Sequence, residues 1–171
     1  MKRSVLVVAL GAFFALTLSA QAAFADSPHF VNGPTYTATT TELTATGKAA
    51  GLGNSPTQAQ LTAQAVNVYS HCVNKGGNFA PGHPATQSPA AGTPQDIAPR
   101  NGQITFSPTL PAPSLSVAAT CPNGNWRIIV DEVDYLGVVL TISQGTTVLL
   151  SDGPNDFTSC AAGIGQCVFT G

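Results

Sequence analysis

The sequence predicts an all-β protein, a two-sheet antiparallel β-sandwich with immunoglobulin-like Greek-key links and about eight strands. Two observations lead to this fold. From Thr35 onward the apolar residues recur with a period of two, which is the spacing of a strand with one buried face. Clusters of Gly, Pro and Asn interrupt the chain at short intervals, as turns between strands do, and no convincing helix is expected.

The first half of the pattern predicts three strands. Two short strands joined by a tight link are expected at residues 36–40 and 43–46. A longer strand is expected at residues 59–72. In the longer strand the apolar side chains change from odd to even positions after Ala65, which indicates a β-bulge or a crossing between the sheets. A helix over 57–69 is the alternative, and the β-branched residues Thr62, Val66 and Val68 weaken it.

Loops dominate residues 74–102, because repeated prolines remove the donors of a β-ladder, and one short edge strand at most is expected there, at 85–88. Later strands are expected at residues 103–107, 115–120, 126–135, 138–142 and 147–150. We expect Ile128–Val130 to be buried on both faces and Trp126 to pack in the small core. A turn-rich tail over 151–171 completes the domain.

The N-terminal segment 1–25 has the composition of a secretory signal peptide. It has a positively charged start, an apolar run from Val5 to Leu18 and a cleavage sequence that ends at Ala25. We therefore expect cleavage after Ala25 and secretion of residues 26–171 as a single domain. Of the 6 basic residues in the chain, four remain in this domain, together with all 8 acidic ones.

Composition excludes some classes of partner. The few scattered basic residues of the mature chain cannot neutralise enough phosphates to hold a nucleic acid. No apolar run after Ala25 approaches the ~20 residues that span a bilayer. We expect a monomer without a cofactor, whose partner is an extracellular or cell-envelope ligand.

All 4 cysteines lie in the part expected to be exported, where an even number indicates disulfides rather than thiols. Three pairings are possible. We favour Cys72–Cys121 with Cys160–Cys167, because the second pair encloses a short flexible stretch that closes easily. A metal site built from Cys72, His71 and His83 is the alternative, disfavoured because the chain has no C-x-x-C pair.

The sequence has no G-x-S-x-G nucleophile elbow, so no catalytic residue is assigned, although a Ser-His-Asp triad assembled in space stays open. The acidic residues Asp131, Glu132 and Asp134 form a cluster. On a strand, Glu132 and Asp134 would point to the same side about 7 Å apart, a spacing that suits the two carboxylates of a glycosidase or a calcium site. The alternative is that the acidic residues mark where a buried strand reaches water.

Residues 76–84 are expected to form an exposed loop, and loops on a rigid sandwich often carry binding function. Asn78, Phe79 and His83 are the candidate binding residues there. Phe79 is either presented as an aromatic anchor or folded back over the edge of the sheet.

The stretches GKAAGLGN at 47–54, CVNKGGN at 72–78 and CPNG at 121–124 resemble a group of small exported bacterial proteins of unknown function. The resemblance implies a secreted β-sandwich and assigns no activity. The tail from Ser159 to Val168 is also similar to the chromophore-carrying apoproteins of the neocarzinostatin type, although their other short disulfide loop has no counterpart in this sequence.

These observations favour an exported, non-catalytic β-sandwich that acts as a binding or structural module. Two alternatives stay open. One is a secreted hydrolase that uses the carboxylates of Asp131, Glu132 and Asp134. The other is a protease inhibitor that presents an exposed loop, either 160–167 or the proline-rich segment 108–113.

Overall fold

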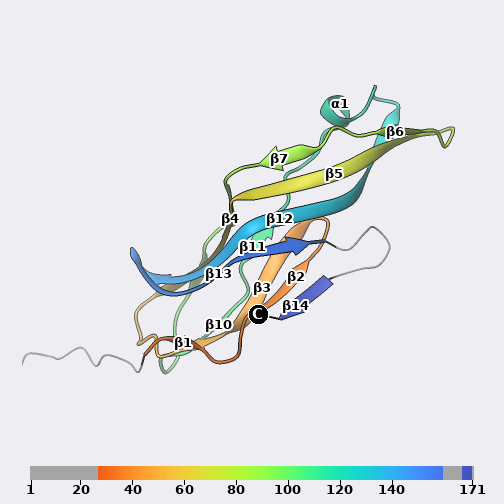
Figure 1. Ribbon diagram of the computed structural model, residues 1–171. Helices are drawn as coiled ribbons and strands as arrows, with labels where there is room; N and C mark the ends of the chain where they lie inside the picture. The colour runs from red at the N-terminus through yellow and green to blue at the C-terminus, as the bar shows by residue number, and fades with distance from the viewer. Residues whose placement is uncertain (1–26, 160–166, 171) are drawn as a thin grey trace, which may run out of the picture.

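Both predicted sheets are present. The computed structural model describes residues 27–159 and 167–170, and most of these residues lie in two antiparallel sheets packed against each other (Figure 1). This confirms the all-β sandwich. The described residues form fourteen strands, more than the sequence predicts, because several stretches expected as loops contribute strands of two or three residues.

Strands of very different lengths make up the two sheets. In chain order they are β1 (His29–Phe30), β2 (Thr35–Ala38), β3 (Glu42–Ala50), β4 (Thr57–Ala63), β5 (Ala65–Asn74), β6 (Phe79–Pro81), β7 (Ala85–Gln87), β8 (Ala90–Ala91), β9 (Gln95–Ile97), β10 (Ile104–Phe106), β11 (Thr109–Pro111), β12 (Trp126–Gln144), β13 (Thr147–Thr158) and β14 (Cys167–Thr170). The smaller sheet has the order β1-β3-β2-β14, and β10 and β11 also pair with β3. The larger sheet has the order β6-β5-β12-β4-β8, with β13 on β12, β7 on β5 and β9 on β4.

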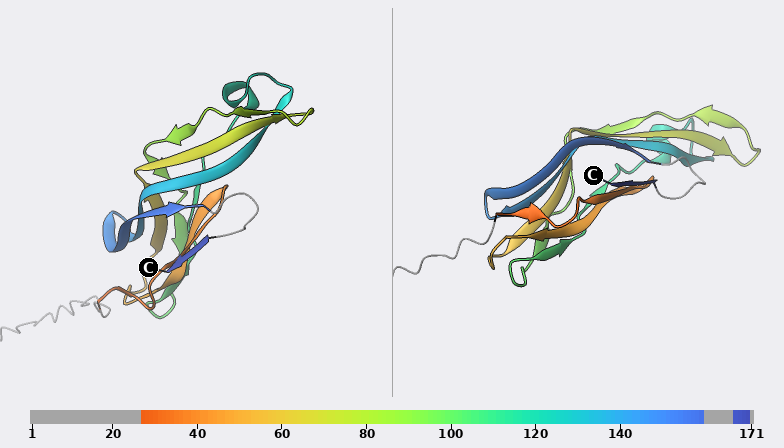
Figure 2. Two further views of the ribbon diagram at one scale, coloured as in Figure 1. Left: turned by 45° about the vertical axis from the view of Figure 1, so that its right-hand side comes forward. Right: turned by 60° about the horizontal axis from the view of Figure 1, so that its bottom comes forward.

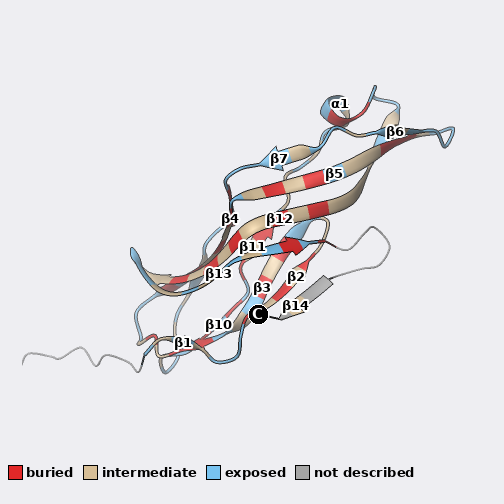
Figure 3. Ribbon diagram, in the orientation of Figure 1, coloured by how far each residue is buried: buried red, intermediate tan, exposed pale blue. Residues whose placement is uncertain are grey.

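The core fills the space between the two sheets, and the buried positions alternate along most of the longer strands (Figure 3). Its largest fully buried side chains are those of Tyr36, Tyr135, Phe106, Leu43, Leu61, Leu110, Leu140 and Ile142. Two of these carry hydroxyl groups that need partners in the interior. Tyr135 donates a hydrogen bond to the carbonyl oxygen of Thr39 at 3.1 Å, and Tyr36 donates to the carboxylate of Asp152. Both hydroxyls therefore join the larger sheet to the smaller one or to its connecting turn.

Strands β4 and β5 follow one another in the larger sheet and are separated by Gln64. Both pair with β12, and the buried positions change from odd numbers in β4 to even numbers in the first part of β5. The predicted change of face is therefore confirmed. It takes place within one sheet, so the predicted crossing between sheets is wrong, and so is the alternative of a helix over 57–69.

The structure corrects two further expectations. Residues Val117–Thr120 form the short helix α1 instead of a strand, and the side chain of Ser116 caps its start by accepting a hydrogen bond from the amide of Ala119 at 3.3 Å. Trp126 and the segment Ile128–Val130 are half-buried instead of belonging to the core, because they lie on the part of the larger sheet that the smaller sheet does not cover. The described chain has no helix long and apolar enough to cross a membrane.

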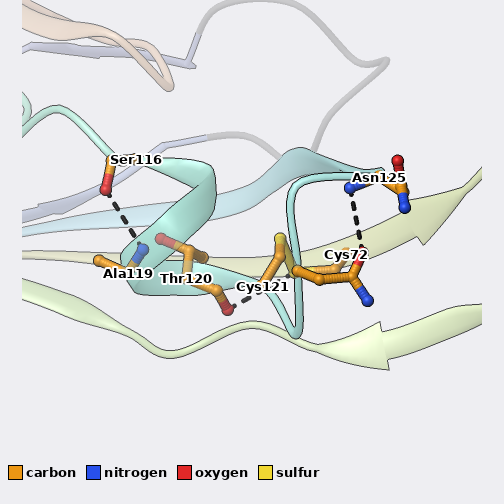
Figure 4. The surroundings of a disulfide bond; sticks show 7 residues. Cys72, Ser116, Ala119, Thr120, Cys121 and Asn125 are labelled. Atoms are coloured by element: carbon orange, nitrogen blue, oxygen red, sulfur yellow. Dashed lines mark hydrogen bonds between the residues drawn. A yellow bond between two sulfur atoms is a disulfide. The ribbon is translucent and has the colours of Figure 1, made fainter.

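A disulfide bond joins Cys72 of β5 to Cys121, which directly follows α1 (Figure 4). This confirms the first predicted pair and excludes the metal site of Cys72, His71 and His83, because the sulfur of Cys72 is used in the bond. The second predicted pair, Cys160–Cys167, lies outside the described residues. The bond fixes α1 beside the end of the larger sheet, and that end extends beyond the smaller sheet (Figure 2).

Candidate functional site at the tip of the larger sheet

The end of the larger sheet that extends beyond the smaller one consists of β6, the later part of β5 and the first part of β12; we refer to it as the tip. A tight turn connects β5 to β6. The side-chain oxygen of Asn74 accepts hydrogen bonds from the backbone amides of Gly76 at 2.9 Å and Asn78 at 3.0 Å. Gly77 has a φ of 76°, a conformation that favours glycine. This turn returns the chain so that Phe79 pairs with Val73 and begins β6.

Phe79 is presented to solvent from an ordered strand. Its side chain is 74% exposed, the largest exposure among the large apolar residues of the described chain. The ring packs against the imidazole of His71, with centroids 5.5 Å apart and planes inclined by 42°. Of the two predicted arrangements of Phe79, the structure has the side chain exposed to solvent, and whether it serves as an anchor stays a prediction.

A carboxylate fixes the imidazole beneath Phe79. The Nδ1 atom of His71 lies 2.7 Å from an oxygen of Asp131, and both side chains are partly exposed. A register shift in β12 between Val130 and Glu132 inserts Asp131 as an extra residue, which is the arrangement of a β-bulge. The bulge brings Asp131 to the same face of the sheet as His71.

The acidic cluster is divided among separate partners. Asp131 is paired with His71, and Asp134 accepts a hydrogen bond from the hydroxyl of Thr158 at 2.8 Å. Nowhere in residues 27–159 and 167–170 do three His, Cys, Asp or Glu side chains gather closely enough to hold a metal ion. The predicted calcium site at Asp131, Glu132 and Asp134 therefore has no support from the geometry.

The His71–Asp131 pair does not extend into a triad through the serine next to it in the chain. Ser70 precedes His71 on β5, so its side chain points to the opposite face of the sheet. Its buried hydroxyl has no hydrogen-bond partner among the described residues. No serine of β5 is therefore placed for attack by way of this pair.

The other two predicted binding residues, Asn78 and His83, contribute only backbone hydrogen bonds among the described contacts. Asn78 is exposed and contributes its backbone to the turn. His83 lies beyond β6, where its amide donates to the carbonyl of Thr120 at 3.2 Å, so it belongs to the surroundings of α1. Sequence reasoning missed the role of His71, because its partner is 60 residues away and is reached only through the register of β12.

Val73, which pairs with Phe79, helps to line an open depression. The depression has a volume of about 510 Å³, and its lining includes Val73, Lys75, Trp126 and Arg127. Two basic side chains, those of Lys75 and Arg127, thus lie together at the tip. No protein-family model matches the sequence, and no curated protein matches it significantly.

Proposed function

We propose that the chain is an exported, non-catalytic binding module and that it contacts an extracellular or cell-envelope ligand through the outer face of the tip. The exposure of Phe79 on an ordered strand carries this proposal. An aromatic side chain with few rotatable bonds gives a large contact area at low entropic cost. Aromatic residues, Phe among them, are enriched at the buried centre of protein–protein interfaces.

The supports of Phe79 make the ring rigid. It is carried by β6, packs on His71 through a contact that Asp131 holds in place, and follows a turn closed by Asn74. A side chain already ordered before binding loses less entropy when its partner arrives. Arg127 pairs with Val73, the residue that pairs with Phe79, and adds a polar contact for the rim of the same surface.

A sedimentation assay with washed envelopes of the producing cells, together with capture of proteins from their medium, tests this proposal. The wild-type protein is expected to bind saturably, and Phe79→Ser to weaken binding about thirtyfold, as for a hot-spot residue. Val148→Ser is the matched control, because Val148 is also exposed, at 56%, and belongs to β13 instead of the tip. Equal binding by the wild type and Phe79→Ser, or no saturable binding by the wild type, would refute the proposal.

Export is the second part of the proposal. Its support is the signal-like composition of residues 1–25 together with the disulfide of Cys72 and Cys121, which is typical of an oxidising compartment. Mass spectrometry of the protein recovered outside the cytoplasm is expected to find Asp26 at the N-terminus. Recovery of the chain in the cytoplasm with Met1 retained would contradict export.

The arrangement of residues 108–113 argues against the alternative that this segment is the exposed loop of a protease inhibitor. Thr109–Pro111 form β11 in the smaller sheet, and Leu110 is fully buried. A segment held in a sheet by its backbone cannot be offered to a protease as a loop. The other predicted inhibitor loop, 160–167, lies almost entirely outside the described residues.

A further inference from the structure

Within residues 27–159 and 167–170, one edge of strand β12 along the tip has no partner strand. β5 pairs with one side of β12 from Trp126 to Leu136, whereas β13 joins the other side only from Asp134 onward. Ser159 adds hydrogen bonds to both backbone groups of Val133. Among the described residues, nothing pairs with this second side of β12 between Arg127 and Glu132.

The hydrogen bonds of β5 show which groups of β12 point to the free edge. The carbonyl of Ser70 accepts from Gly82, and the amide of Asn74 donates to Asn78, so both residues direct their backbone groups away from β12. Backbone direction alternates along a strand, which gives Cys72 the same orientation. Since Cys72 faces Ile128 and Ser70 faces Val130, the N–H and C=O groups of Ile128 and Val130 point to the free edge.

We propose that two copies of the chain pair antiparallel through this edge, about a two-fold axis at Ile129. In this register Ile128 of one copy forms a hydrogen-bonded pair with Val130 of the other, and the symmetry repeats the pair on the far side of the axis. The groups that point to the edge thereby satisfy one another. Strand addition of this kind is a common way for an open sheet edge to find a partner.

The charges select this register. With the axis at Ile129, Arg127 of each copy lies opposite Asp131 of the other, on the outer face of the sheet. Opposite charges directly across an antiparallel pair are favourable, and like charges are unfavourable. A shift by two residues keeps the hydrogen bonds but places Arg127 opposite Ile129, and the charge pairs are lost. Charged side chains and bulges at an edge usually prevent pairing with another strand. Here the charges of Arg127 and Asp131 are opposite in sign, so they attract a second copy of the same edge.

The opposite face of the same edge supplies apolar contact. Ile128 and Val130 are half-buried and, with Val68 and Leu115, help to line an open depression of about 400 Å³. Antiparallel pairing would place Ile128 and Val130 of the second copy against this depression, because paired residues present their side chains on the same face. The proposal replaces the sequence-based expectation of a monomer.

Sedimentation equilibrium of the mature exported protein tests the proposal. The wild type is expected to be a dimer, and Arg127→Asp and Asp131→Arg each to raise the dimer dissociation constant about tenfold or more. The double variant Arg127→Asp/Asp131→Arg is expected to recover most of the affinity, because it restores the charge pairs with reversed signs. Loss of the His71 contact cannot explain this recovery, since the double variant lacks that contact as well.

Lys75→Asp is the matched control, because it makes the same change of charge at the tip without belonging to the paired edge. It is expected to leave the dimer unchanged, and near-UV circular dichroism of all variants monitors the fold. A wild type that stays monomeric up to about 100 μM, a concentration at which a weak specific dimer would form, would overturn the proposal. So would a dimer that tolerates both single variants, or a double variant that fails to recover.

Discussion

Gly137 of β12 lies opposite Gln64, at the bend where β4 gives way to β5. The amide of Gln64 donates to the carbonyl of Leu136 at 2.9 Å. The buried positions of β12 change here from odd numbers, ending at Tyr135, to even numbers, beginning at Val138. The facing strands β4 and β5 change in the same way between Ala63 and Val66. Because both strands change face at facing residues, the register is the same before and after the bend.

Gly137→Ala is expected to lower the free energy of unfolding by about 2 kcal/mol. The φ of Gly137 is 60°, and a Cβ there would lie 2.6 Å from the side chain of Gln64. Gly145→Ala is the control, because its φ is 58° and a Cβ would meet nothing within 4 Å, so only the cost of the backbone conformation remains. Urea denaturation measures both values. An equal loss in the two variants would show that the contact with Gln64 contributes nothing.

Gly92→Ala is expected to be more damaging, by about 3 kcal/mol or more. A Cβ at Gly92 would lie 1.9 Å from the carbonyl oxygen of Thr109, and a backbone atom cannot rotate away as a side chain does. Gly124→Ala meets nothing within 4 Å and is expected to have the stability of the wild type. Thermal unfolding of the two variants makes the comparison, and a stable Gly92→Ala would contradict the close approach of β8 and β11.

Alkaline pH is expected to destabilise the protein through Tyr36 and Tyr135. Burial raises the pKa of both phenols, and the carboxylate of Asp152 raises the pKa of Tyr36 further. Above the unfolded-state pKa of about 10, the unfolded chain loses these protons while the folded chain keeps them. The stabilising effect is therefore complete below about pH 10 and is lost as the pH rises above it.

Tyr36→Phe is expected to flatten this alkaline decline, because the variant has one fewer buried phenol. It also removes the hydrogen bond to Asp152, which lowers the stability at neutral pH by about 1–2 kcal/mol. Denaturation at a series of pH values separates the two effects. An unchanged alkaline slope in Tyr36→Phe would show that Tyr36 does not contribute to it.

Replacing both Cys72 and Cys121 by Ala is expected to lower the free energy of unfolding by about 4 kcal/mol, since the bond closes a long loop in the unfolded chain. The two residues are separated by 49 positions. Denaturation of the double variant and of the oxidised wild type measures the loss, and the reduced wild type is the control for the change of side chains. A change below about 1 kcal/mol would show that the tip is held by its sheet contacts alone.

His71→Ala is expected to weaken ligand binding about tenfold, less than Phe79→Ser, because Phe79 remains but loses the ring that orients it. Stability is expected to change by less than about 1 kcal/mol, because the contact between His71 and Asp131 is partly exposed to solvent. His83→Ala is the control, since His83 is exposed and lies beside α1. Binding equal to that of the wild type in His71→Ala would contradict the positioning role.

The sequence was sufficient to predict the sandwich and the change of face near Ala65, because the alternation of apolar residues indicates both. Trp126 was misplaced because alternation does not show where one sheet stops covering the other. The helix α1 was missed because it is only one turn long and depends on a local cap at Ser116. Phe79 could be predicted from its loop, whereas its support by His71 and Asp131 depends on a bulge that only the pairing of β5 and β12 reveals.

The disulfide of Cys72 and Cys121 has a consequence for proteolysis. Every short strand from β6 to β11, with the proline-rich connections between them, lies between these two cysteines in the chain. A protease that cuts any one of those connections leaves both fragments joined by the bond and by their pairing in the sheets. The nicked protein therefore remains one molecule, and reduction is required before its pieces can separate.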